Sequence, residues 1–256
     1  MQQMPENPFD LSGKVAIITG GGTGVGRAIA LLLSKHGAIV VLASRKMQNL
    51  EAVAQEVKAQ GGRALPVRTD VKVAADVEGL VKRTMEEFGQ IDILVNNAGG
   101  TYMKPAEELT VESWDNLAAL NVRGPFLGCL YAGRVMIQQK RGVIVNISSL
   151  AGSNGAWGVV PYASAKAGLQ QMTKVLAGEW GKYGIRVNCV ALGAVMNEGY
   201  VRSMTLAGKD PYAAKNALGR IGEPVDIAYP VLFLVSDASR WMTGETIAVC
   251  GGPRFQ

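Results

Sequence analysis

Short apolar runs rich in Val, Ile and Leu recur along the chain, each bounded by Gly, Asp or Asn, and longer stretches with helical periodicity separate them. This alternation predicts a doubly wound α/β fold, in which helices cover both faces of a parallel sheet. The seven predicted strands are residues 15–19, 39–43, 64–68, 91–95, 143–147, 186–190 and 246–249. The predicted helices begin near Gly24, Met47, Ala74, Val111, Gly124, Pro161 and Pro224.

No Pro/Ser-rich or charge-dense linker interrupts the 256 residues, and no internal repeat is present. We therefore predict a flexible segment over residues 1–10 and a single domain over residues 11–256. The three cysteines are far apart and the chain has one histidine, so neither a disulfide framework nor a metal site is expected, which suits a cytoplasmic protein.

The formal net charge of +5 changes this picture little, because Lys and Arg are interleaved with Asp and Glu and form no basic run. We expect no nucleic-acid partner and a solvated surface with some attraction for an anionic cofactor. No apolar stretch is long enough to serve as a signal peptide or to span a bilayer, so no membrane association is expected.

A glycine-rich turn follows the first predicted strand and precedes a helical run over residues 27–36. In such a turn, backbone N–H groups and the helix N-terminus can face a pyrophosphate without a Cβ in the way. The turn predicts a dinucleotide site. Its candidate residues are Gly20, Gly22, Gly24 and Gly26.

The end of the second strand, where the adenosine ribose would lie, reads Ala43-Ser44-Arg45-Lys46 and has no carboxylate. The Arg45 guanidinium can hold a 2′-phosphate through paired hydrogen bonds, with the Ser44 hydroxyl beside it. The sequence therefore favours NADP(H), with NAD(H) as the alternative. The competing interpretation is that Arg45 and Lys46 simply open a surface helix.

Five ordered motifs resemble those of the short-chain dehydrogenase/reductase family, in its short single-domain branch. The resemblance extends from about Leu11 to Gly252. The motifs are Gly20-x-x-x-Gly24-x-Gly26, Asp70-Val71, Asn96-Asn97-Ala98-Gly99, Ile147-Ser148-Ser149 and Tyr162-Ala163-Ser164-Ala165-Lys166. The resemblance implies a Rossmann-type sheet with strand order 3-2-1-4-5-6-7 and hydride exchange between NAD(P)(H) and a carbonyl or alcohol carbon.

The resemblance also implies cofactor contacts that spacing alone does not assign. Asp70 and Val71 would meet the adenine, Asn96 the ribose, and the Val195 backbone the nicotinamide carboxamide. Thr23 and Val25 would join the glycines at the phosphates. Ala98 and Gly99, in the same motif as Asn96, are further candidates, whereas Asn97 would tie neighbouring strands together. Asn121 would hold a water that relays protons to Lys166; a lone asparagine is otherwise more often a helix cap or kink.

Tyr162 and Lys166 are four residues apart, so they share one face of a helix. A nearby ammonium favours the phenolate and is expected to lower the tyrosine pKa toward neutrality. Taken alone, such a pair is an ordinary feature of an amphipathic helix. Ser149 strengthens the argument that the pair is catalytic. It lies at the carboxyl end of a predicted strand, at the edge where ligands bind in open α/β sheets, and its hydroxyl can donate a hydrogen bond to the substrate oxygen.

The chain departs from the family pattern at Leu192-Gly193 and Asn197, where the family has Pro-Gly and Thr, and at Cys250, where it has an acidic residue. We interpret Cys250 as a buried small residue and His36 as a surface or packing residue. A substrate loop is expected over residues 193–220. An apolar pocket for a medium-sized ketone is predicted from Tyr102, Met103, Trp157, Met196, Tyr200 and Met204.

Two other functions fit the sequence less well. The run Ala43-Ser44-Arg45-Lys46-Met47 resembles dienoyl-CoA reductases of the same family, which reduce a conjugated double bond. A dinucleotide-sensing protein without catalysis is the other alternative, although such family members typically lose the tyrosine or the lysine. The resemblance also implies a homotetramer that packs through helices over residues 124–139 and 161–181, whose small residues permit close approach.

Overall fold

A computed structural model describes residues 7–196 and 216–252, and the predicted alternation of strands and helices is confirmed in it. All seven strands pair in parallel in one sheet, in the order β3-β2-β1-β4-β5-β6-β7. The strands are β1 (Val15–Thr19), β2 (Ile39–Ser44), β3 (Ala64–Arg68), β4 (Ile93–Asn96), β5 (Gly142–Ser149), β6 (Ile185–Leu192) and β7 (Thr246–Val249).

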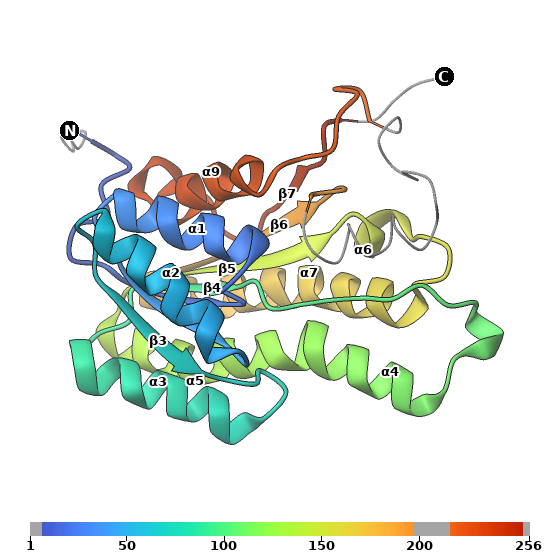
Figure 1. The fold of residues 1–256 in the computed structure, drawn as a ribbon, viewed down its shortest axis with the longest axis horizontal. Helices are drawn as coiled ribbons and strands as arrows, with labels where there is room; N and C mark the ends of the chain where they lie inside the picture. The colour runs from blue at the N-terminus through green and yellow to red at the C-terminus, as the bar shows by residue number, and fades with distance from the viewer. Residues whose placement is uncertain (1–6, 197–215, 253–256) are drawn as a thin grey trace.

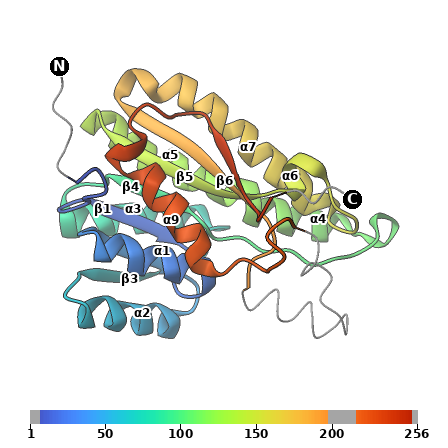
Figure 2. The same ribbon diagram turned by 90° about the horizontal axis from the view of Figure 1, so that it is seen from above.

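Helices lie on both faces of the sheet, with α1, α2 and α9 on one side and α3, α5 and α7 on the other (Figures 1 and 2). The main helices are α1 (Gly24–Lys35), α2 (Met47–Ala59), α3 (Ala74–Phe88), α4 (Val111–Ala118), α5 (Gly124–Gln139), α6 (Ala151–Asn154), α7 (Val160–Trp180) and α9 (Pro224–Val235). Single turns occupy η1 (Ala106–Glu108), η3 (Gly181–Tyr183) and η4 (Asp237–Ser239), and a π-helical turn, η2 (Ala119–Arg123), joins α4 to α5.

The two-faced core explains why β1 is apolar throughout instead of alternating with polar residues. Ala16 and Ile18 pack with the helices of one face, whereas Val15 and Ile17 pack with those of the other. Successive side chains of a strand point to opposite faces, so a strand covered on both sides must be apolar at every position.

Several predicted boundaries were wrong by one or two residues. β4 begins at Ile93 instead of residue 91, and both β5 and β6 extend two residues further toward their carboxyl ends than predicted. Pairing with β6 keeps the polar end of β5 in the sheet, because Ser149 pairs with Leu192. Of the N-terminal segment predicted as flexible, residues 7–10 form a turn in which Phe9 packs against the core.

Candidate functional site

The glycine-rich turn lies at the carboxyl end of β1 and leads directly into α1. Gly20 and Gly24 adopt positive φ values of 68° and 51°. A Cβ on Gly20 would lie 2.6 Å from the Asn97 amide nitrogen, so the turn and the end of β4 are in close contact. The Thr23 side chain does not cap α1, and the first-turn N–H groups of a helix lack intrahelical acceptors. This cradle fits the pyrophosphate of a dinucleotide.

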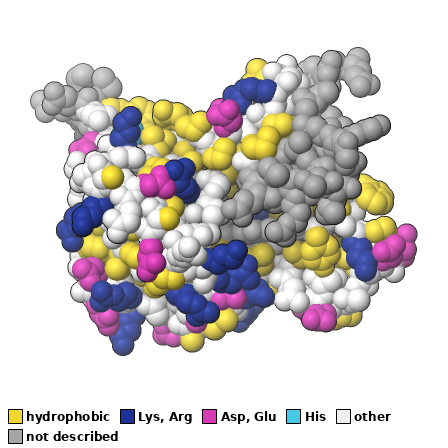
Figure 3. Space-filling view, viewed as in Figure 1, with side chains coloured by type: hydrophobic (Ala, Val, Ile, Leu, Met, Phe, Trp, Pro, Cys, Tyr) yellow, Lys and Arg dark blue, Asp and Glu magenta, His cyan; other side chains and the backbone are white. Residues whose placement is uncertain are grey.

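The end of β2 carries an exposed cation. Within the described part of the chain, the Arg45 guanidinium has neither a hydrogen-bond nor an ion-pair partner. Ser44 is half-buried and lies opposite Arg68 of β3. Lys and Arg side chains gather below the centre of the face in Figure 3, where Figure 1 places α2 and β3. This side of the cradle is therefore suited to an anionic group.

The residues assigned to the adenine and ribose differ in whether their side chains can contact a cofactor. One Asp70 carboxylate oxygen accepts a hydrogen bond from the Lys72 N–H (3.0 Å), and Val71 is buried. The Asn96 side chain is buried and donates to the Asn146 Oδ1 (2.9 Å), so its amide points into the interior. A ribose contact from Asn96 stays a prediction, and only its backbone is available for one. Asn97 donates to the Thr19 carbonyl (2.9 Å), consistent with its predicted role as a tie between strands.

The three predicted reacting groups come together at the carboxyl ends of β5 and β6. Lys166 is buried on α7, where its Nζ donates to the Ile147 carbonyl (2.7 Å) and lies 5.6 Å from the centroid of the Tyr162 ring. The Ser149 side chain lies near enough to the Tyr162 phenol to affect the pKa of the phenol. A Cβ on Gly99 would lie 3.4 Å from the Lys166 Nζ, so the loop after β4 closes the site.

Burial sets the protonation of this site. Desolvation raises the pKa of Tyr162 above its ordinary value of 10.0, and the nearby Ser149 side chain opposes this rise. Burial also lowers the pKa of Lys166 from 10.5 to about 8, opposed by the nearby Cys189 thiol. The expected net lowering of the Tyr162 pKa toward neutrality was wrong for the chain alone, because desolvation dominates. A protonated phenol at neutral pH is suited to donating a proton.

Asn121 lies in the π-helical turn η2 and is fully buried. Its Nδ2 donates to the carbonyls of Gly100 (2.9 Å) and Leu117 (3.0 Å), and its Oδ1 accepts from the Gly100 N–H (3.1 Å). One amide hydrogen and the amide oxygen therefore hold the loop after β4, and the other amide hydrogen bonds to the last turn of α4. The proton-relay role implied by the resemblance stays a prediction.

Apolar side chains surround the entrance to the site. Tyr102, Met103 and Trp157 are 43%, 51% and 72% exposed, and the Lys104 N–H donates to the Gly158 carbonyl (2.8 Å), which joins their two loops. Hydrophobic side chains are also visible beside the grey residues in Figure 3. Tyr200 and Met204 lie outside the described residues, as does Asn197.

The residues that depart from the family pattern lie at the neighbouring carboxyl ends of β6 and β7. Val195 is buried and forms a parallel bridge with Gly222, which fixes the backbone just after β6. A Cβ on Gly193 would lie 2.7 Å from the Cys250 Cβ, so the two strand ends approach closely. Cys250 is half-buried, so the expectation of a buried residue was wrong.

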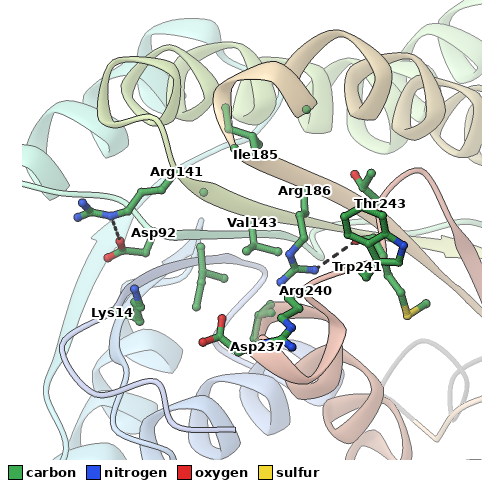
Figure 4. Close-up of a pocket in the computed structure, with 16 residues that line it drawn as sticks. Lys14, Asp92, Arg141, Val143, Ile185, Arg186, Asp237, Arg240, Trp241 and Thr243 are labelled. Atoms are coloured by element: carbon green, nitrogen blue, oxygen red, sulfur yellow. Dashed lines mark hydrogen bonds and ion pairs between the residues drawn. The ribbon is translucent and has the colours of Figure 1, made fainter. Parts of the chain in front are cut away.

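A hollow of about 530 Å³ lies at the opposite, amino edge of the sheet (Figure 4). Its polar groups are largely engaged by the protein itself. Arg141 donates to the Asp92 carboxylate (3.0 Å), and Arg186 donates to the carbonyls of Leu234 (2.9 Å) and Ser236 (3.1 Å). The Tyr–Ser–Lys group and the glycine cradle lie at the other edge, which we therefore take as the candidate active site.

Comparison with known proteins agrees with this geometry. Residues 20–253 match a family model described as enoyl-(acyl carrier protein) reductase. A short-chain type dehydrogenase/reductase from Mycobacterium marinum has a similar structure, with a TM-score of 0.90 and 36% identity over 95% of this chain and 96% of that one. The chain belongs to the short-chain dehydrogenase/reductase family. The resemblance inferred from the five motifs is thereby confirmed.

Two further members of the family are similar over nearly their whole length. One is a subunit of a hydroxy(phenyl)methylsuccinyl-CoA dehydrogenase from Thauera aromatica, 40% identical over 94% of this chain and 97% of the relative. The other is a 7α-hydroxysteroid dehydrogenase in complex with NADH and a 7-oxo bile acid, with 31% identity, a TM-score of 0.94 and 99% coverage of both chains. This short-chain dehydrogenase/reductase is an NAD(P)-dependent oxidoreductase acting between CH–OH and C=O.

Proposed function

We propose that this short-chain dehydrogenase/reductase interconverts a ketone and a secondary alcohol, with Tyr162 as the acid and base and NADP(H) as the preferred cofactor. The observation that carries the proposal is the convergence of the Tyr162 phenol, the Ser149 side chain and the Lys166 ammonium at one edge of the sheet, beside Gly99.

The chain's own residues act on the substrate oxygen. When bound, the reduced dinucleotide supplies a hydride to the carbonyl carbon. Ser149 donates a hydrogen bond to the carbonyl oxygen, and Tyr162 transfers its proton to that oxygen as charge develops. Lys166 binds the nicotinamide ribose and favours the resulting phenolate electrostatically. In the oxidative direction Tyr162 accepts the proton from the alcohol.

The preference for NADP(H) rests on Arg45. An exposed guanidinium without a protein partner, at the end of β2, matches a 2′-phosphate through paired hydrogen bonds. NAD(H) is the alternative, and the 7α-hydroxysteroid dehydrogenase relative holds NADH. A direct comparison of kcat/KM for the two cofactors decides between them.

The substrate we propose is an apolar ketone of medium size. Exposed apolar and aromatic side chains on the two joined loops at the entrance, Tyr102, Met103 and Trp157, support this class. A second candidate activity is reduction of a conjugated enoyl thioester, which the description of the matching family model favours. A non-catalytic dinucleotide sensor is the third.

The test is a panel of ketones, alcohols, quinones and enoyl thioesters, assayed with both cofactors by nicotinamide absorbance. We expect turnover of ketones, and Tyr162→Phe should reduce it about 10²–10⁴-fold while leaving cofactor affinity nearly unchanged. Tyr183→Phe, on η3 at the amino edge, is the matched control. Full activity of Tyr162→Phe contradicts the assigned role, and cofactor binding without any turnover favours the sensor.

We also propose a homotetramer. Phe126 on α5 and Val175 on α7 are 45% and 48% exposed, which supports a contact surface on these two helices. Sedimentation or light scattering measures the state directly. Among the described residues, no helix is long and apolar enough to cross a membrane. A cytoplasmic location and the lack of a nucleic-acid partner stay predictions.

A further inference from the structure

Strand β5 extends beyond its neighbour β4 at the active site. β4 ends at Asn96, which pairs with Asn146, whereas β5 continues to Ser149. The Val143 N–H donates to the Asp92 carbonyl on the β4 side. Because backbone groups alternate along a strand, those of Ile147 and Ser149 face the same side, where β4 has already ended. Their carbonyls therefore need partners from outside the sheet.

Helix α7 supplies both partners. The Lys166 Nζ donates to the Ile147 carbonyl (2.7 Å), and the Gln170 Nε2 donates to the Ser149 carbonyl (3.0 Å). The spacings match, because four helical residues rise about 6 Å and two strand residues about 6.6 Å. Gln170 thus replaces the missing strand at the residue that carries the reacting hydroxyl.

A second set of hydrogen bonds orients the Gln170 amide. The Gln170 Nε2 also donates to the Ser148 Oγ (3.1 Å), which itself donates to the Lys166 carbonyl (3.1 Å). The Gln170 Oε1 accepts from the Ser153 hydroxyl on α6 (3.0 Å). Both amide hydrogens and the amide oxygen are therefore engaged, and Gln170 links the backbones of Ser149 and Lys166 through Ser148.

We propose that Gln170 is a positioning residue that holds Ser149 in place relative to Tyr162 and Lys166. The inference rests on the proposed function, in which the Ser149 hydroxyl contacts the substrate oxygen. Removing the Gln170 amide leaves the Ser149 carbonyl without its partner and allows the end of β5 to move. The hydroxyl is then misaligned in the transition state, while the cofactor cradle at the end of β1 is untouched.

The test compares Gln170→Met with Gln171→Met, which changes the exposed neighbouring glutamine to the same side chain. We expect Gln170→Met to lower kcat about tenfold, with the KM for the cofactor within about twofold of the parent value. Gln171→Met should leave both constants within about twofold. Equal kcat values for the two variants overturn the proposal.

A double-mutant cycle separates positioning of Ser149 from a general structural role. In a Ser149→Ala background, Gln170→Met should have no further effect on kcat, because the hydroxyl that it misaligns is absent. An unchanged tenfold loss in that background overturns the proposal.

Hydrogen exchange gives a readout that does not need turnover. The peptide over residues 147–151 should exchange faster in Gln170→Met than in Gln171→Met. If the parent protein turns over no member of the panel, the proposed function fails by itself, and this measurement decides whether Gln170 holds Ser149. Equal exchange in the two variants then refutes the inference.

Discussion

The charged residues at the two edges of the sheet differ in how far the protein satisfies their hydrogen bonds and charges. At the amino edge, Arg186 is enclosed by backbone carbonyls and the Ser239 hydroxyl, and Arg141 is paired with Asp92. At the carboxyl edge, Lys166 is buried with a single carbonyl as its hydrogen-bond partner among the described residues, and Arg45 has no partner there.

We infer from this difference that the charged residues of the amino edge contribute to stability and those of the carboxyl edge to function. A polar group whose hydrogen bonds are satisfied by the protein contributes to folding, and its loss leaves other buried groups unpaired. A buried charge with little compensation destabilises the fold, and such groups cluster at functional sites. Substitutions at the two edges should therefore have opposite effects on stability and activity.

The largest effect is expected from Lys166→Met. Turnover should fall about 10²–10³-fold, because the ammonium no longer favours the Tyr162 phenolate. The variant should nevertheless be more stable at neutral pH, by about 1–2 kcal/mol after loss of the Ile147 bond, because burial lowers the Lys166 pKa from 10.5 to about 8.

The sign of the pH dependence follows from that lowered pKa. The cost of burying the ammonium is fully present below pH 8 and disappears as pH rises toward 10.5, so the stability gain of Lys166→Met should shrink over that range. Urea unfolding between pH 7 and pH 10 measures it, with the exposed Lys174→Met as control. A variant less stable than the parent at pH 7 contradicts the comparison.

Arg186→Met should produce the reverse pattern. Its loss removes the charged hydrogen bonds from the guanidinium to the carbonyls of Leu234 and Ser236, which should lower the free energy of unfolding by about 2–4 kcal/mol. The kcat of the folded protein should not change. Arg240→Met, an exposed cation of the same hollow, is the matched control in urea unfolding. A stable but inactive Arg186→Met variant would indicate that the amino edge takes part in catalysis.

Arg45→Asp should change cofactor choice with little effect on stability. Repulsion between the new carboxylate and a 2′-phosphate should shift the NADPH-to-NADH ratio of kcat/KM about 10–100-fold toward NADH. Lys58→Asp, at the far end of α2, makes the same charge change away from the cradle. An unchanged ratio in Arg45→Asp overturns the NADP(H) preference.

The smallest effect is expected outside both edges, at the ion pair between Arg220 and Asp226 in the first turn of α9. Two hydrogen bonds from Arg220 (2.6 and 2.9 Å) and one from the Glu223 N–H lower the pKa of Asp226 to about 2. Arg220→Met should return this pKa part of the way toward 3.8, as followed by NMR titration. Stability should fall slightly at neutral pH. The difference from the parent should shrink as pH falls below the variant's pKa and vanish below about pH 2, where the carboxyl is protonated in both proteins.

Much of the site could be predicted because its residues stand in local motifs. Tyr162 and Lys166 are one helical turn apart, and Ser149 ends a strand, so the sequence places each on its element. The sequence signal for Gln170 is weak and consists only of its position four residues after Lys166. Its importance depends on how far β5 extends beyond β4, which no local pattern specifies.

The sequence by itself determined the order and type of the elements, because hydrophobic periodicity and glycine positions act over a few residues. It also determined which edge of the sheet carries the chemistry, since the motifs follow the strands. Only the tertiary structure decided which polar groups are satisfied. The inward-facing Asn96 amide, the π-helical turn at Asn121 and the raised Tyr162 pKa all depend on burial by residues distant in sequence.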